Sequence, residues 1–175
     1  MTAWIFRLHQ HDERALHALV LRRRPRLDAA IHLVTHLGDA AVTIGITLAL
    51  MLSAVPRAAS TGRRAAFALV ASHLVVQLVK RTVTRARPKM PTGVLALVKP
   101  PDRFSFPSGH AASSLSVALP VAMAAGGFMG GAMVGVAVVV GLSRCYLGVH
   151  YPGDVLAGWL LALLGTVGAG MMLAV

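Results

Sequence analysis

The stretch Ser143–Asp154 reads SRCYLGVHYPGD and joins two strongly apolar segments of the chain. Charged groups beside segments suited to lipid are costly, so they usually pair with one another or mark a functional site. A carboxylate hydrogen-bonded to one imidazole nitrogen would fix the tautomer of His150 and make its other nitrogen a better base or nucleophile. We therefore expect His150 and Asp154 to act together, with Arg144 supplying a positive group suited to phosphate oxygens.

The composition is that of a membrane protein rather than a soluble one. Of the 175 residues, 56% are hydrophobic and 13% are charged, and the length fits one domain. The net charge of +11 comes mainly from basic residues in short polar segments between apolar ones. That placement indicates contact with anionic lipid headgroups or a phosphorylated substrate, not with nucleic acid. The single cysteine, Cys145, excludes an internal disulfide and is expected to be a small buried apolar group.

Five apolar segments predict five membrane-spanning helices, at residues 29–55, 65–79, 108–125, 126–142 and 155–175. No alternating strand pattern appears, so the expected fold class is an all-α polytopic membrane bundle. Residues 56–64, which hold three arginines, are expected to form a turn. Four polar residues in the first turns of the first segment either face the site or lie at the headgroup level, and the headgroup level is the favoured interpretation: His32, Thr35, His36 and Asp39.

Small residues recur at helical spacing in the last two spans and predict faces that a neighbouring helix approaches closely. They are Gly127, Gly131 and Gly135 in the fourth span, and Gly158, Ala162, Gly165 and Ala169 in the fifth. In the second span, His73 and Gln77 lie four residues apart and share one helical face. We expect this pair to take part in an interhelical hydrogen bond.

Residues 1–26 predict an amphipathic helix lying at the membrane interface, and residues 27–175 predict a transmembrane domain. Apolar side chains are interspersed with arginines in the first segment, and Pro25 is expected to break the helix. The alternative is an ordinary polar tail. The apolar members are Trp4, Ile5, Phe6, Leu16, Leu19, Val20 and Leu21.

With five spans, three polar segments fall on the same side of the membrane: Lys80–Pro88, Pro107–His110 and Ser143–Asp154. Together they hold three strong cations, two histidines, one aspartate and a Ser-Gly pair at a helix start. The cations can neutralise a phosphate group through short, charge-assisted hydrogen bonds: Lys80, Arg87 and Arg144. The backbone amides that open the third span also suit an anion: Ser108, Gly109 and His110.

Two histidines divide the expected chemistry. His150, oriented by Asp154, is the candidate nucleophile that attacks phosphorus. His110 is the candidate general acid for the leaving oxygen and then the base that activates water. This scheme needs no metal and no other cofactor. A zinc site on the same histidines and Asp154 is the competing interpretation, which three nearby cations disfavour.

The patterns KxxxxxxRP, PSGH and SRxxxxxHxxxD, present in this order, resemble the complete signature of the type 2 phosphatidic acid phosphatase (PAP2) superfamily. The resemblance runs from about Ala29 to the carboxyl terminus. It implies a helical membrane core, metal-independent hydrolysis and a phosphohistidine intermediate, with His150 as nucleophile, Asp154 as its orienting partner and His110 as acid. It also implies that the phosphate is held by Lys80, Arg87, Ser108, Gly109 and Arg144. The chain resembles the smaller bacterial lipid phosphatases, so we expect it in a bacterial inner membrane.

The expected substrate is an isoprenoid diphosphate, a phosphatidylglycerol phosphate, phosphatidic acid or a polyprenyl-linked sugar phosphate. Two other functions stay open: a phosphotransferase that passes phosphate from His150 to an acceptor hydroxyl, and a non-catalytic anionic-lipid binder. Of the 17 basic residues, only Arg57, Arg63 and Arg64 fall on the side away from the site, which leaves 14 on the site's side. This excess favours a cytoplasmic site, although cations that bind substrate contribute to it. The sequence does not indicate an oligomeric state.

Overall fold

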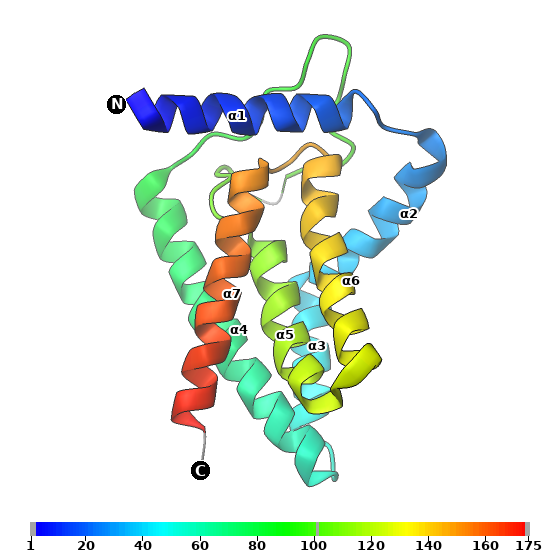
Figure 1. Cartoon of the computed structure of the whole chain (residues 1–175), viewed down its shortest axis with the longest axis vertical. Helices are drawn as coiled ribbons and strands as arrows, with labels where there is room; N and C mark the ends of the chain where they lie inside the picture. The colour runs from blue at the N-terminus through cyan, green and yellow to red at the C-terminus, as the bar shows by residue number, and fades with distance from the viewer. Residues whose placement is uncertain (1–2, 101, 174–175) are drawn as a thin grey trace.

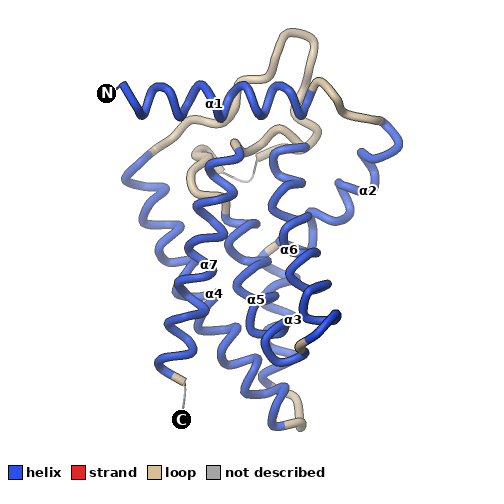
Figure 2. The backbone as a smooth tube through the Cα atoms, viewed as in Figure 1, coloured by secondary structure: helices blue, strands red, loops and turns tan. Residues whose placement is uncertain are grey.

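The computed structural model describes residues 3–100 and 102–173, with side chains from residue 9 onward. Within these residues all regular secondary structure is helical (Figure 2). The elements are α1 (Ala3–Val20), α2 (Pro25–Thr35), the short 3-10 helix η1 (His36–Gly38), α3 (Ala40–Met51), α4 (Pro56–Val83), α5 (Gly109–Ala125), α6 (Gly127–Tyr146) and α7 (Pro152–Met172).

The helices suit a membrane. Among the described residues, α4, α6 and α7 are each long and apolar enough to cross a bilayer, and the segments Pro25–Gly38 and Ala40–Met51 together form a fourth candidate span that is bent by 52°. Helix α5 is also apolar but has only 17 residues. These elements stand where the sequence predicts spans, and they run side by side in one bundle (Figure 1). The predicted all-α membrane bundle is confirmed.

The first predicted span is not one continuous helix, which corrects the sequence-based expectation. The backbone becomes extended at Asp39, with φ −65° and ψ 147°. Just before this break, a Cβ atom on Gly38 would lie 2.7 Å from Cγ1 of Val140 and 3.1 Å from Cβ of His110. Glycine therefore lets the chain approach α5 and α6 closely, and the break brings Asp39 to α5.

Helix α4 is longer than predicted, because residues 56–64 form its first turns instead of a separate turn. Pro56 occupies the first turn, where its missing N–H would have no partner and its fixed φ suits a helix start. Near this end, Gly62 packs against the backbone of Leu50 and Met51 in α3. Helices α3 and α4 thus touch at the end away from Lys80, and α4 leans away from α3 toward its other end (Figure 1).

Helix α5 lies inside the bundle and packs against α4, α6 and α7. The predicted small-residue face of α7 is confirmed, since all four of its members are buried: Gly158, Ala162, Gly165 and Ala169. A Cβ atom on Gly158 would lie 2.5 Å from the carbonyl oxygen of Ser108, and one on Gly165 would lie 2.9 Å from that of Ala68. This face therefore holds α7 against both α5 and α4.

The predicted packing stripe on α6 is wrong. Gly127, Gly131 and Gly135 are exposed, and a Cβ atom on each would meet nothing within 4 Å in the described structure. The buried glycine positions of α6 are Gly130 and Gly141 instead. The indole of Trp159 on α7 lies 2.6 Å from a Cβ built on Gly141. The buried face of α6 therefore differs from the predicted one, because Gly141 leaves room for Trp159 and Gly130 packs against the backbone of Ala122 in α5.

Helix α1 lies across the ends of the bundle helices, and a loop of the segment between α4 and α5 extends past it (Figure 1). Leu16 and Val20 are buried in a cluster with Cys145, Tyr151 and Val155. The structure describes side chains only from residue 9 onward, so those of Trp4, Ile5 and Phe6, which contribute to the amphipathic prediction, are outside its description. The helix ends at Val20, and Pro25 begins α2.

Candidate active site

The three predicted segments meet at the end of the bundle that α1 covers (Figure 1). Lys80 lies in the last turn of α4, Ser108 caps α5, Arg144 lies in the last turn of α6, and Asp154 lies in the first turn of α7. His150 lies in the short link between α6 and α7. The three segments therefore lie at one end of the bundle, as the five-span count predicts.

The ring of His150 is buried between an aspartate and an arginine. Its Nδ1 lies 3.5 Å from Oδ2 of Asp154, and its Nε2 lies 2.9 Å from Nη1 of Arg87. An arginine nitrogen can only donate, so Nε2 of His150 accepts this hydrogen bond and carries no proton. The proton of the neutral ring is then on Nδ1, which faces the carboxylate of Asp154.

The protein environment keeps His150 neutral. Burial lowers its pKa to about 4, and the charges of Arg87 and Arg144 act in the same direction, while Asp154 opposes them. At pH 7 the imidazole therefore has a free electron pair on Nε2. This is the state that a nucleophile requires.

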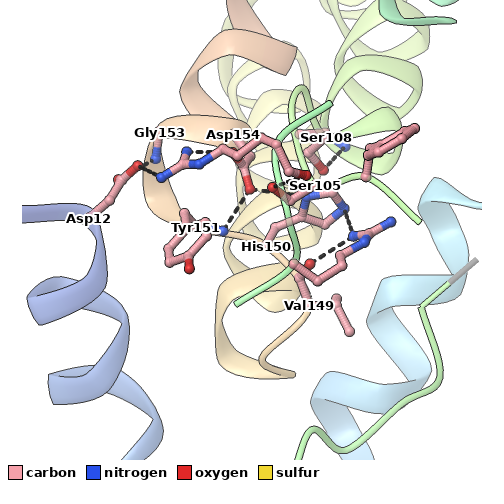
Figure 3. A network of polar contacts seen from close by, with 12 residues as sticks. Asp12, Ser105, Ser108, Val149, His150, Tyr151, Gly153 and Asp154 are labelled. Atoms are coloured by element: carbon pink, nitrogen blue, oxygen red, sulfur yellow. Dashed lines mark hydrogen bonds and ion pairs between the residues drawn. The ribbon is translucent and has the colours of Figure 1, made fainter. Parts of the chain in front are cut away.

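Asp154 is completely buried and is held by two strong donors (Figure 3). Its Oδ2 accepts a hydrogen bond from the backbone N–H of Tyr151 at 2.8 Å, and its Oδ1 accepts one from Nη1 of Arg85 at 2.7 Å. The other terminal nitrogen of Arg85 donates to Oδ2 of Asp12 on α1 at 2.8 Å. Oδ1 of Asp12 in turn accepts from the N–H of Gly153 at 2.8 Å. Arg85 and Asp12 are site residues that the sequence analysis missed.

Two of the predicted phosphate-binding cations are bridged by one carboxylate. Asp102 accepts from Nζ of Lys80 at 2.5 Å through Oδ2 and from Nη2 of Arg87 at 2.6 Å through Oδ1. Burial opposes ionisation of Asp102, but the hydrogen bonds and charges of Lys80 and Arg87 outweigh it and hold its pKa below the ordinary value. The carboxylate therefore occupies an anion position between these two cations.

The third predicted cation, Arg144, is buried and reaches toward the bent first span. Its Nη1 donates to Oγ1 of Thr35 at 2.7 Å. Its Nε is buried and has no hydrogen-bond partner within residues 3–100 and 102–173. Thr35 is thus part of the site rather than a headgroup-level residue, which corrects the prediction.

His110 is held by a carboxylate from the bend between η1 and α3. Its Nε2 donates to Oδ1 of Asp39 at 2.8 Å, and Oδ2 of Asp39 accepts from Nδ1 of His36 at 2.7 Å. The assignment of His36 and Asp39 to the headgroup level is therefore wrong. Because the Nε2–H of His110 is donated to Asp39, Nδ1 of His110 is the nitrogen left for proton exchange with a ligand.

The start of α5 offers fewer free amides than predicted. Ser108 is buried, its N–H donates to the carbonyl oxygen of Asp154 at 2.9 Å, and its Oγ accepts from the N–H of Ala111 at 3.4 Å. Ser108 thus joins α5 to α7 and caps the helix. The N–H groups of Gly109 and His110 have no partner in the described part of the chain, so they remain suited to an anion.

A cavity of about 530 Å³ opens in front of these groups. His110 and His150 both line it, together with Lys80, Asp102 and Gly109. The predicted nucleophile, acid and cation therefore face one ligand-sized space. Within the described residues, no three His, Cys, Asp or Glu side chains are grouped so that they could hold a metal ion.

The small number of acidic residues in the sequence is a signal that could have identified the missed carboxylates. The chain has only six Asp and Glu residues, and four of them lie in the contacts just described: Asp12, Asp39, Asp102 and Asp154. In so basic a membrane protein, each carboxylate is a candidate partner for a functional cation or histidine. Spacing alone does not show which partner each one takes.

Comparisons with known proteins identify the family of the chain. Residues 61–172 match the protein family described as the PAP2 superfamily. Decaprenylphosphoryl-5-phosphoribose phosphatase from Mycobacterium tuberculosis (strain ATCC 25618 / H37Rv) is 36% identical over 146 residues, which cover 83% of this chain and 79% of that protein.

Two crystal structures have the same fold. The first transmembrane PAP2 type phosphatidylglycerolphosphate phosphatase from Bacillus subtilis superposes with a TM-score of 0.74 at 27% identity, covering 94% of this chain and 85% of that one. LpxE from Aquifex aeolicus superposes with a TM-score of 0.75 at 20% identity, covering 89% and 92% of the two chains. The family match and these relatives show that the chain belongs to the PAP2 superfamily and is an integral membrane phosphatase.

Proposed function

We propose that the protein removes the terminal phosphate of a membrane lipid phosphate or diphosphate through a phosphohistidine on His150. The observation that carries this proposal is the placement of Nε2 of His150, which lies 2.9 Å from Nη1 of Arg87 beside a cavity that Lys80 and His110 also line. A neutral imidazole next to cations can approach an anionic phosphate whose charge those cations neutralise.

In the first step, Nε2 of His150 attacks phosphorus and the bond between phosphorus and the leaving oxygen breaks. Protonated His110 gives a proton to that oxygen, so that the lipid departs as an alcohol or a lower phosphate. In the second step, neutral His110 accepts a proton from water while the water oxygen attacks the phosphohistidine. The bond between phosphorus and Nε2 breaks, inorganic phosphate forms, and both histidines return to their starting states.

The surrounding residues have distinct roles in this scheme. Lys80, Arg87 and Arg144 neutralise the phosphoryl oxygens, and the free amides of Gly109 and His110 bind the same oxygens at the positive end of α5. Ser108 supports the phosphate site by capping α5. Asp154 orients His150, and Arg85 is a positioning residue that acts through Asp154. The carboxylate of Asp102 has to leave Lys80 and Arg87 when phosphate enters.

The names of the relatives support a substrate class. The relatives are named for a polyprenyl-linked sugar phosphate and for phosphatidylglycerolphosphate. Both names describe a phosphate monoester attached to a membrane lipid, and this supports a lipid phosphate as the substrate here. No partner protein or cofactor is required by the scheme.

The placement in the membrane is also part of the proposal. We assign α1 to the interface plane, where it covers the site end, and residues 27–175 to the bilayer domain of a bacterial inner membrane. The excess of basic residues at the site end favours the cytoplasmic face. A cytoplasm-dependent reporter fused after Val175 should be inactive, because α7 ends opposite the site; an active reporter would reverse the assignment.

The test is release of inorganic phosphate by purified protein in detergent, with EDTA present. The substrates are undecaprenyl diphosphate, phosphatidylglycerol phosphate, phosphatidic acid and a soluble phosphate ester. Release that survives EDTA and disappears in His150→Ala supports the proposal. If phosphate appears on an added alcohol instead of free in solution, the protein is a phosphotransferase; if His150→Ala has full function, the site only binds lipid.

A further inference from the structure

The cavity at the active site extends as a groove between α3 and α4. Its walls are largely apolar and lie on both helices: Ala40 and Ile44 on α3, and Leu69, Val70 and Leu74 on α4. Beyond these walls, α3 and α4 meet where Gly62 packs against Leu50 and Met51. Three of the wall residues, Ile44, Val70 and Leu74, are also exposed on the surface of the bundle. A lipid chain can therefore enter from the bilayer while its phosphate reaches Lys80.

One polar pair interrupts these apolar walls. His73 and Gln77 line the same cavity as Lys80, His110 and His150. The amide nitrogen of Gln77 lies 3.1 Å from Nε2 of His73, so the pair bonds within α4 and not between helices as the sequence analysis expects. A histidine and a glutamine at this level of a spanning helix are costly when they face hydrocarbon, which makes them a candidate functional feature.

The pair retains hydrogen-bonding capacity toward the groove. The amide nitrogen of Gln77 can only donate, so Nε2 of His73 accepts and the ring proton is on Nδ1. The donor Nδ1–H of His73 and the acceptor Oε1 of Gln77 have no partner within the part of the chain that the structure describes. The pair can therefore offer one donor and one acceptor to a ligand.

The spacing along α4 sets which part of a ligand reaches the pair. Gln77 is three residues from Lys80 and His73 is seven, so all three share one face of the helix. At 1.5 Å per residue, Gln77 lies about 4.5 Å and His73 about 10.5 Å below Lys80 along the helix axis. These are the distances from a bound phosphate at which a sugar or a glycerol ester would stand, before the hydrocarbon chain begins.

From this juxtaposition we propose that His73 and Gln77 form a second recognition site for an oxygen-bearing linker between the terminal phosphate and the hydrocarbon. Sugar hydroxyls and glycerol ester groups share this chemistry, whereas a plain polyprenyl or alkyl phosphate is hydrocarbon from the phosphate onward. The inference rests on the proposed function. It adds that the enzyme selects phosphates carried on a sugar or glycerol over phosphates carried directly on a hydrocarbon chain.

The test compares kcat/KM for three single-chain phosphates of similar chain length. Alkyl phosphate has no linker, lysophosphatidic acid has a glycerol ester, and an alkyl glucoside 6-phosphate has a sugar. We expect the wild-type protein to prefer one of the two linked substrates over alkyl phosphate by about tenfold, since one or two hydrogen bonds are gained. The preferred substrate identifies which linker the pair recognises.

The variant His73→Leu/Gln77→Leu removes both polar groups while keeping the wall of the groove filled. Its activity on alkyl phosphate should stay within about twofold of wild type, and the preference for the linked substrate should disappear. Thr82→Val is the control, because Thr82 also lies on α4 and bonds only to helix carbonyls. The control should keep the preference. A thermal unfolding midpoint of each variant shows that folding is unchanged.

Two outcomes overturn the inference. Either the wild-type protein hydrolyses all three substrates equally well, or the double variant loses activity on linked and unlinked substrates to the same extent. These results differ from a failure of the proposed function, in which no lipid phosphate of any kind is hydrolysed.

Discussion

Nη1 of Arg85 lies 2.7 Å from Oδ1 of Asp154, and the same guanidinium reaches Asp12 on α1 through Nη2 at 2.8 Å. Its plane also lies over the ring of Tyr151, with Cζ 4.1 Å from the ring centre. One arginine therefore joins the covering helix to the carboxylate that lies beside His150. In the proposed mechanism this makes Arg85 a positioning residue that touches no reacting atom.

Replacing Arg85 by glutamine should lower kcat by about 10- to 100-fold, because Asp154 loses a charged donor and His150 is less precisely oriented. The pKa of His150 should rise above its value of about 4, since Asp154 is then free to stabilise the imidazolium. NMR titration of labelled histidine measures this shift. Arg85→Lys, which keeps the charge, should have a kcat and a His150 pKa between those of wild type and Arg85→Gln. An unchanged His150 pKa in Arg85→Gln would mean that Arg85 is only structural.

Asp102 bridges Lys80 and Arg87 in the position proposed for phosphate. Asp102→Asn should therefore strengthen competitive inhibition by inorganic phosphate, with an inhibition constant lower by about threefold to tenfold, because the cations lose a bound anion. The matched control is Asp28→Asn, whose carboxylate binds the hydroxyl of Tyr146 instead. Weaker inhibition in Asp102→Asn would show that Asp102 organises the cations rather than competing with phosphate.

Stability should depend on pH through His150. Its pKa is lowered from 6.5 to about 4, so between these values the unfolded chain binds a proton that the folded protein does not. Stability contributed by the neutral ring is thus complete above about pH 6.5 and falls as the pH drops, by up to roughly 3 kcal/mol. The thermal unfolding midpoint of wild type should fall more between pH 7 and 4.5 than that of His150→Asn. Equal falls would contradict a buried neutral histidine.

Asp39 holds His110 through a 2.8 Å hydrogen bond, which predicts a dependence on the leaving group. His110→Asn and Asp39→Asn should lower hydrolysis of an alkyl phosphate by about 100-fold, in line with loss of general acid catalysis. Cleavage of an aryl phosphate, whose phenolate leaves without a proton, should fall much less in the bond-breaking step. The check is a single-turnover comparison of both substrates. The same loss for both would remove the acid role from His110.

Gly165 packs against the backbone of Ala68, where a Cβ atom would lie 2.9 Å from a carbonyl oxygen. Gly165→Ala should therefore destabilise the α4–α7 contact by about 1–3 kcal/mol. Gly170 on the same helix has nothing within 4 Å of its Cβ position, and Gly170→Ala should be neutral or stabilising. Thermal unfolding in detergent compares the two, and a similar loss for both would show that α7 packs differently.

Sequence patterns predict the helical bundle and the meeting of the three motifs because both depend on long apolar segments and on their number. The bend in the first span was not predictable in this way. It depends on Gly38 approaching Val140 and His110, which are far away in the sequence. The same limit explains the α6 stripe: spacing identifies a smooth face, but the bulk of Trp159 decides which face is buried.

Within the site, the residues of the three motifs are predictable because their chemistry and spacing are local. Their partners are not, since Asp39, Asp102 and Arg85 act through contacts that folding creates. Ser108 is a motif residue whose role is changed by a contact that folding creates. Its position at a helix start indicates a free amide, yet the packing of α7 gives that amide to the carbonyl oxygen of Asp154.

The phosphohistidine is tested most directly by trapping it. His110→Asn protein is mixed with a lipid-like aryl phosphate labelled with ³²P, quenched within one turnover and denatured. The account predicts label bound to protein that survives base, is lost in acid, and is absent from His110→Asn/His150→Asn. Aryl alcohol released in the burst phase without any protein-bound label, or label that persists when His150 is replaced, would contradict a covalent intermediate on His150.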